Sequence, residues 1–159
     1  MTDQTDQAGR GRGEKFNAEG YHDPTAHAAM SEIRQEQTTA QRMTNAAGWP
    51  LVYVCSPYAG DILNNERKAR RYCQYAISKQ VMPVASHLLY PQLLDERDPE
   101  DRALGLAFGL KLLGKCAQCW VFGRTITPGM AQEIGEAHRL GLKVRYFTED
   151  MEEVYGHDR

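Results

Sequence analysis

One acidic residue, Glu133, follows a short apolar run and a loop at a position where α/β proteins often carry out chemistry. The apolar run, residues 119–122, is typical of a buried strand, and the spacing of apolar side chains over residues 130–140 predicts a helix. Glu133 would then lie in the first turn of that helix, just beyond the carboxyl end of the strand, which is the edge where open parallel sheets bind ligands. A carboxylate at this edge can serve as a nucleophile or a general base, or it can simply complement the helix dipole.

Polar side chains also follow two other apolar runs, at the points where the predicted strands end. Residues 51–55 are followed by Ser56, Tyr58, Gly60 and Asp61, residues 81–84 by Ser86 and His87, and residues 119–122 by Arg124, Thr125 and Thr127. Because parallel strands all point the same way, their carboxyl ends meet at one edge of the sheet, and these groups should gather there with Glu133. Convergence from three separate loops is stronger evidence for a site than any single motif.

The turn after the first run has the composition of an anion-binding loop, but it carries no standard nucleotide signature. Free amides in a turn that leads into a helix suit a phosphate or a sugar hydroxyl. The turn holds one glycine and no Gly-Lys-Ser/Thr, so it matches neither the Walker A motif nor the dinucleotide fingerprint. Arg124 could bind a phosphate with two hydrogen bonds, and Gly129 would let a ligand approach the backbone closely. The plainer alternatives are an ordinary loop at 56–61, a solvated Arg124 and a hydrogen-bonded structural His87.

Cysteine and histidine residues do not form a metal-binding pattern. The four cysteines are Cys55, Cys73, Cys116 and Cys119. Cys116 and Cys119 have the spacing of half a zinc knuckle, but no second pair of ligands completes it, and the five histidines form no paired motif. We therefore expect buried thiols without a disulfide framework, no metal site and no organic cofactor.

The order of apolar runs and helical spacings predicts an α/β fold. Continuous apolar runs mark strands at 51–55, 81–84, 119–122 and 143–147, and helical spacing marks helices at 64–79, 98–113 and 130–140. Crossovers between parallel strands are almost always right-handed, so these units predict a parallel sheet covered by helices on both faces. The acidic tail, residues 148–159, is predicted to be partly helical.

Composition divides the chain into three segments. Residues 1–20 are rich in Gln, Gly, Asp and Arg, and we expect them to be disordered. Residues 21–48 are expected to form a helical arm, in which Asp23 can cap a helix that begins with Pro24. This arm could dock on the body or on a second subunit. Residues 49–159 form the expected main domain.

The overall charge and hydropathy of the chain exclude several function classes. The net charge of the 159 residues is −2, so there is no basic field of the kind that binds a nucleic acid polymer. No run of about 18 apolar residues predicts a membrane span, and residues 1–13 lack the apolar core of a signal peptide. We therefore expect a cytoplasmic protein with no membrane partner.

Three motifs together resemble a known superfamily. The residues 52–61, Val-Tyr-Val-Cys-Ser-Pro-Tyr-Ala-Gly-Asp, are followed by Asn65 and Ala69, Pro83 precedes His87, and residues 129–133 read Gly-Met-Ala-Gln-Glu. This pattern is similar to that of the nucleoside 2-deoxyribosyltransferase-like proteins, and is closest to uncharacterised bacterial and phage members of that superfamily. The resemblance covers about residues 51–147.

The resemblance implies a fold, a reaction and an assembly. The fold would be a flavodoxin-like three-layer parallel sheet with strand order 2-1-3-4 and room for a fifth strand. Glu133 would attack the anomeric carbon of the sugar and release the base, while Ser56 would help to hold a 5′-phosphate. Asn65 and Met130 would join the other polar loop residues around a nucleoside or nucleotide. A homo-oligomer is also implied, with an apolar helix surface at Ala103, Leu106, Ala107 and Leu110 available for contact.

Two acidic positions of the transferases are changed in this sequence. Thr127 stands six residues before Glu133, where the transferases carry an aspartate, and Gly123 with Arg124 replaces another acid just after the third strand. Asp61 is the available substitute, and a more cationic pocket would favour a phosphorylated ligand. The sequence therefore predicts a hydrolase or transferase of the N-glycosidic bond that uses Glu133. The alternatives are a non-catalytic nucleotide-binding or sensor module and a structural partner protein that acts through its N-terminal arm.

Overall fold

The computed structural model describes residues 24–155, so the expected disordered segment 1–20 and the expected cap Asp23 lie outside the described residues. The first element is helix α1 (Pro24–Ala46), whose described side chains are almost all exposed to solvent. A second compact unit begins at Asn45 and contains every other described element.

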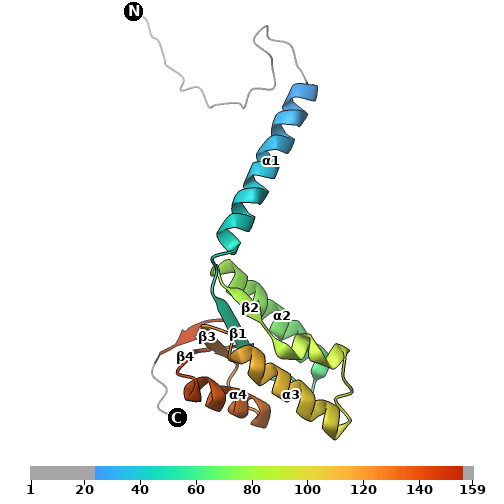
Figure 1. Ribbon diagram of the computed structural model, residues 1–159, viewed down its shortest axis with the longest axis vertical. Coiled ribbons are helices and arrows are strands. Elements are labelled where there is room, and N and C mark those ends of the chain that lie inside the picture. The colour runs from blue at the N-terminus through green and yellow to red at the C-terminus, as the bar shows by residue number, and fades with distance from the viewer. Residues whose placement is uncertain (1–23, 156–159) are drawn as a thin grey trace, which may run out of the picture. The chain divides into compact units, whose positions relative to one another are not determined.

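The second unit is built on a five-stranded sheet with the order β2-β1-β3-β4-β5. Figure 1 labels the first four of these strands. Strands β1 (Leu51–Cys55), β2 (Met82–Val84), β3 (Gln118–Phe122) and β4 (Lys143–Phe147) are parallel. The predicted α/β fold, with the order 2-1-3-4 and a fifth strand, is therefore confirmed.

The fifth strand corrects the prediction of a partly helical tail. Strand β5 (Glu153–Val154) is antiparallel to β4, with Val154 opposite Tyr146. Arg145 holds it in place, because its guanidinium donates two hydrogen bonds to the Glu153 carboxylate at 2.7 and 2.5 Å. That guanidinium also lies over the rings of Trp120 and Phe147. This pairing with β4 overrides the weak local preference of the tail for a helix.

Three helices pack on the sheet, and each begins at a capped residue. Helix α2 (Ile62–Ser78) is capped by Asp61 and helix α3 (Pro99–Leu113) by Asp98. Helix α4 (Pro128–Arg139) is capped by Thr127, whose hydroxyl accepts a hydrogen bond from the amide of Met130. Because α4 starts at Pro128, Glu133 lies in its second turn, and the prediction of a first-turn position was wrong. The helix dipole, which acts mainly on the first turn, is therefore a poorer explanation for this residue.

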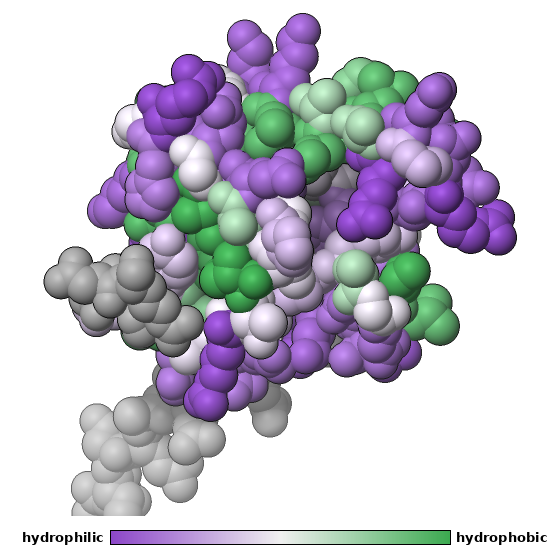
Figure 2. Space-filling view, turned by 90° about the horizontal axis from the view of Figure 1, so that it is seen from below, coloured by the Kyte–Doolittle hydropathy of each residue, from purple (hydrophilic) through white to green (hydrophobic). Residues whose placement is uncertain are grey.

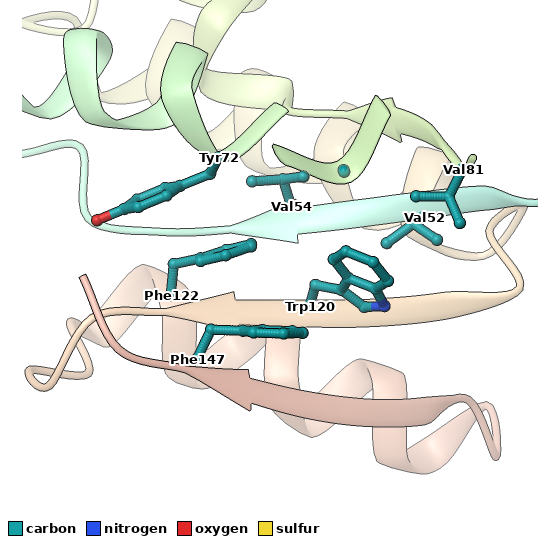
Figure 3. Close-up of a cluster of buried hydrophobic side chains, with 8 residues drawn as sticks. Val52, Val54, Tyr72, Val81, Trp120, Phe122 and Phe147 are labelled. Carbon is teal, nitrogen blue, oxygen red and sulfur yellow. The ribbon is translucent and has the colours of Figure 1, made fainter. Parts of the chain in front are cut away.

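Alternation along the strands separates two cores. Val52, Val54, Trp120, Phe122 and Phe147 point toward α2, where the ring of Tyr72 stacks on Phe122 (Figure 3). The opposite side chains of β1 and β3 face α3 and α4, which cover the other side of the sheet (Figure 1). The side chain of Tyr53 thus reaches the α3–α4 side, where the candidate site lies.

The outer surface of α3 differs from the one expected. Leu110 packs against the core and Leu106 lines a cavity, so neither belongs to a free contact surface. Ala103 is exposed but lines the same cavity, and Ala107 is exposed as expected. Two larger apolar side chains, Leu104 and Phe108, are exposed beside them. Because α3 carries apolar residues on all of its sides, its sequence alone does not show which of them are exposed.

Candidate functional site

A cavity of about 690 Å³ opens at the carboxyl end of the strands, on the α3–α4 side of the sheet. Figure 2 looks at the molecule from this end, where hydrophobic and hydrophilic side chains surround a hollowed surface. Two short 3₁₀ helices, η1 (Ser86–Leu88) and η2 (Tyr90–Gln92), contribute to the wall of the cavity. The predicted site residues among those lining it are Ser56, Tyr58, Gly60, His87, Gly129, Met130 and Glu133. Three separate loops therefore do bring polar groups to one place.

The most buried acidic group of the cavity is Glu133, and it is held by a tyrosine. Tyr53 donates a hydrogen bond of 2.7 Å to Oε1 of Glu133, and its oxygen lies 2.7 Å from Oγ of Ser86. Since the single hydroxyl proton of Tyr53 goes to Glu133, the Ser86 hydroxyl is left to donate to the tyrosine oxygen. The result is a directed chain, Ser86 to Tyr53 to Glu133, that fixes one oxygen of the carboxylate.

Burial and hydrogen bonding act in opposite directions on the pKa of Glu133. Removal from water raises the pKa of this carboxyl, while hydrogen bonds from Tyr53 and Cys55 lower it. The pKa of Tyr53 is raised far above its ordinary value, first by burial and then by the neighbouring negative charge of Glu133. Tyr53 therefore remains a hydrogen-bond donor at any pH at which the protein would work. A carboxylate with a raised pKa and one fixed oxygen is well suited to covalent or acid–base chemistry.

A glycine on α3 permits the contact between Tyr53 and Ser86. A Cβ atom added at Gly109 would lie 3.0 Å from the Tyr53 hydroxyl and 3.1 Å from Oγ of Ser86. Both distances are shorter than ordinary carbon–oxygen contacts, and both neighbours are buried. Gly109 therefore lets the helix backbone approach the hydroxyl pair that supports Glu133.

A second polar pair lies in the wall of the cavity. Oγ of Ser56 is 3.2 Å from Nε2 of His87, and the ring of Tyr58 lies 6.0 Å from the imidazole. Burial lowers the pKa of His87 to about 4. The imidazole is therefore neutral at neutral pH and can exchange hydrogen bonds with Ser56 or with a bound ligand, without adding a charge.

The neutral state of His87 should make the stability of the fold depend on pH. Its folded pKa lies below the ordinary value of 6.5, so protonation favours the unfolded chain. Neutral His87 should make its full contribution to the free energy of unfolding above about pH 6.5. This contribution, about 3 kcal/mol, should be lost as the pH falls toward 4. Urea unfolding at several pH values would measure it, with His87→Gln as the comparison. If the variant and the parent lose the same stability between pH 7 and pH 4, this interpretation of His87 is wrong.

Two predicted site residues serve the local structure instead of lining the cavity. The Asn65 amide donates to the carbonyl oxygens of Tyr58 and Ala59, both at 3.0 Å, which shapes the loop after β1. Asp61 accepts from the amide of Asn64 as the cap of α2, and it is exposed. The carboxylates that line the cavity are Glu133 and, at some distance along the chain, Glu96. Asp61 is therefore poorly placed to substitute for the missing acids.

Arg124 lies outside this cavity. Gly123 adopts φ of +98°, which turns the chain just after β3, and Arg124 lines a second cavity with Gly123 and Ile126. The arginines that line the candidate site are Arg97 and Arg102, which lie just before and within the first turn of α3. Arg97 is paired with Asp95 at 3.1 Å. The expected cationic character is therefore present, but it comes from other residues.

The described part of the chain contains neither a cluster of metal ligands nor a membrane-spanning helix. Across residues 24–155, no three His, Cys, Asp or Glu side chains gather closely enough to hold a metal ion. None of the helices in that range has the length and apolar character needed to cross a bilayer. All four cysteines are free thiols.

Comparison with known proteins places the fold and the family. The structure is similar to that of a 2-deoxyribosyltransferase from Bacillus psychrosaccharolyticus, with a TM-score of 0.51 and 18% sequence identity over 67% of this chain and 77% of the other. At that identity the likeness concerns the fold alone. A search of curated proteins found no match. Residues 50–147, more than half of the chain, match the model of a family described as a domain of unknown function, DUF7768, and the protein belongs to that family.

Proposed function

We propose that residues 49–159 form an enzyme domain that acts on the N-glycosidic bond of a nucleoside or nucleotide, with Glu133 as the nucleophile. The observation that carries this proposal is the buried Glu133 carboxylate, held by Tyr53 in the wall of a cavity large enough for a nucleotide. The fold shared with a 2-deoxyribosyltransferase supports the choice of substrate class.

The reaction would proceed in two displacements. In the first, the Glu133 oxygen that Tyr53 does not bind forms a bond to the anomeric carbon as the bond from that carbon to the base nitrogen breaks. The base leaves with the electron pair and takes up a proton. In the second, water or the nitrogen of another base attacks the same carbon and restores the carboxylate. The negative charge of Glu133 would stabilise the oxocarbenium-like transition state of each step.

The other lining residues would bind and orient the substrate. Ser56 and the neutral His87 supply uncharged hydrogen-bonding groups suited to sugar hydroxyls or phosphate oxygens. Tyr58 presents an aromatic surface, and Gly129 leaves the start of α4 open, since a Cβ added there would meet nothing within 4 Å. Arg102, at the rim, would pair with a phosphate.

The second candidate function is a binding or sensor module without turnover. It is favoured by the small number of acids at the site, because Asp61 caps α2 and the Thr127 hydroxyl caps α4. Without a second well-placed acid, protonation of a departing base would depend on water or on the base itself.

Incubation with a panel of nucleosides and nucleoside monophosphates separates the two functions. Chromatography would measure release of the free base, and calorimetry would measure binding of the same compounds. Release of a base supports the enzyme, while binding without release over many hours supports the sensor. Absence of both binding and turnover across the panel would refute both.

We also propose that the domain self-associates through the outer face of α3. The exposed residues of this face are spaced so that they lie on one side of the helix. Glu100 lies at its start, the apolar residues Leu104, Ala107 and Phe108 at its centre, and Lys111 at its end. Two such helices that pack in antiparallel fashion would join their apolar centres and place each Glu100 near a Lys111 of the other copy.

Substitution of Phe108 by glutamate should disrupt this association. A charge at the centre of the contact would be buried without a partner, so the dissociation constant should rise at least about 10-fold. Light scattering at tens of micromolar would report a dimer or larger assembly for the parent and a smaller one for the variant. Ile77→Glu, at an exposed apolar position on α2, is the control. A monomeric parent would rule the contact out.

A further inference from the structure

A second cavity of about 690 Å³ lies beyond the carboxyl ends of β3 and β4, against α4. No residue in the described range 24–155 lines both this cavity and the candidate active site. Helix α4 separates the two, because Met130 and Glu133 line the first cavity while Ile134 and His138 line the second.

The walls of this cavity are mainly apolar, and its charged group is a cation. Side chains of Ile126, Ile134 and Val154 supply aliphatic surface, and Tyr146 supplies aromatic surface. Arg124 is exposed, and within residues 24–155 its guanidinium makes no hydrogen bond or ion pair. Among the described residues no carboxylate lines the cavity, so no acidic group of that part of the chain offsets the positive charge.

We propose that this cavity binds a small organic acid with an aromatic body, and that Arg124 pairs with its anionic group. The apolar walls would bury the aromatic body, and the volume is typical of small-molecule sites. A guanidinium can donate two parallel hydrogen bonds to a carboxylate, sulfonate or phosphate group, which gives the ligand a fixed orientation. The positive charge of Arg124 therefore favours an anionic ligand, and the apolar walls favour an organic anion over an inorganic one.

Two glycines on α4 make the two cavities separately testable. A Cβ atom added at Gly135, in the second cavity, or at Gly129, in the first, would meet nothing within 4 Å. Neither glycine has a positive φ, so a larger residue is compatible with the helical backbone at both positions. Gly135→Leu should therefore fill the second cavity, and Gly129→Leu should partly fill the first, without strain in the helix.

The test is a fluorescence titration of the full chain with 1-anilinonaphthalene-8-sulfonate, an aromatic sulfonate. We expect saturable binding with one molecule per chain. Arg124→Ala should weaken it about 10-fold or more, as expected for loss of a charge-assisted hydrogen bond, and Gly135→Leu should abolish it. Gly129→Leu should leave it unchanged, and 10-fold excess inorganic phosphate should not displace the probe. Thermal melts of each variant would establish that it is folded.

Three results would overturn the proposal: no saturable binding, binding that survives both Arg124→Ala and Gly135→Leu, or binding that is abolished by Gly129→Leu instead. None of these depends on Glu133 or on turnover. Failure of this proposal would therefore be distinct from failure of the proposed enzymatic function.

Discussion

Replacement of Glu133 by glutamine is expected to remove nearly all turnover of the nucleoside or nucleotide that the parent protein cleaves, while binding survives. Glutamine keeps the size of the side chain and can still accept the hydrogen bond from Tyr53. It cannot stabilise the positive charge of the transition state or form a stable ester with the sugar. Loss of a nucleophile typically lowers the rate by about 10³-fold or more.

The matched control is Glu96→Gln, because Glu96 also lines the cavity but is not held by Tyr53. Release of the free base, followed by chromatography, should change little in this variant. Binding of the same nucleotide, followed by calorimetry, should be retained in both. Undiminished turnover by Glu133→Gln would remove Glu133 from the mechanism.

The same substitution should have the opposite effect on stability. The pKa of Glu133 is raised in the folded protein, so the ionised form is the one that folding disfavours. The protonated Glu133 makes its full contribution to the free energy of unfolding below the ordinary pKa of a glutamate. That contribution is lost as the pH rises through the raised pKa of the folded protein. Glu133→Gln should therefore unfold at a temperature no lower than the parent at neutral pH. Such a pairing of lost activity with retained or increased stability is characteristic of a functional acid in a buried site.

The parts of the fold that depend on local pattern were predictable from the sequence. The two strands β1 and β4 begin and end at the predicted residues, because uninterrupted apolar runs between turns leave little choice. The start of α4 was missed because Thr127 was interpreted as a polar residue of the loop, whereas its hydroxyl caps the helix. The residues of strand β5 were not located, and the tail was predicted to be partly helical, because two residues carry no periodicity and their pairing depends on Arg145 of β4.

The candidate site was predictable where a strand end fixes the position of a residue, but not where a single backbone angle decides it. Ser56 and His87 follow strands directly or closely, and both line the cavity with Glu133. Arg124 also follows a strand, but the positive φ of Gly123 intervenes and Arg124 lines the other cavity. Tyr53 was not recognised because a tyrosine within an apolar run is usually a packing residue. The signal that could have identified Tyr53 is its hydroxyl group, because a buried hydroxyl in an otherwise apolar strand needs a hydrogen-bond partner.

Substitution of Tyr53 by phenylalanine tests whether the hydroxyl chain tunes Glu133 for chemistry. The change keeps the ring but removes the hydrogen bond to Oε1 and leaves Ser86 without its partner. A hydrogen bond to a charged group is worth about 1.5–3 kcal/mol, so turnover should fall about 10- to 100-fold.

The pH profile of this variant distinguishes tuning from simple damage to the fold. The hydrogen bond from Tyr53 lowers the pKa of Glu133 against the effect of burial, so its loss should raise that pKa further. The nucleophile must be ionised, and the acid limb of the rate profile should therefore move to higher pH in Tyr53→Phe. Tyr75→Phe, which removes a hydroxyl on the opposite face of the sheet, should leave the profile in place. A Tyr53→Phe variant with lower turnover but an unmoved acid limb would mean that the tyrosine only packs the site, and that burial alone sets the ionisation of Glu133.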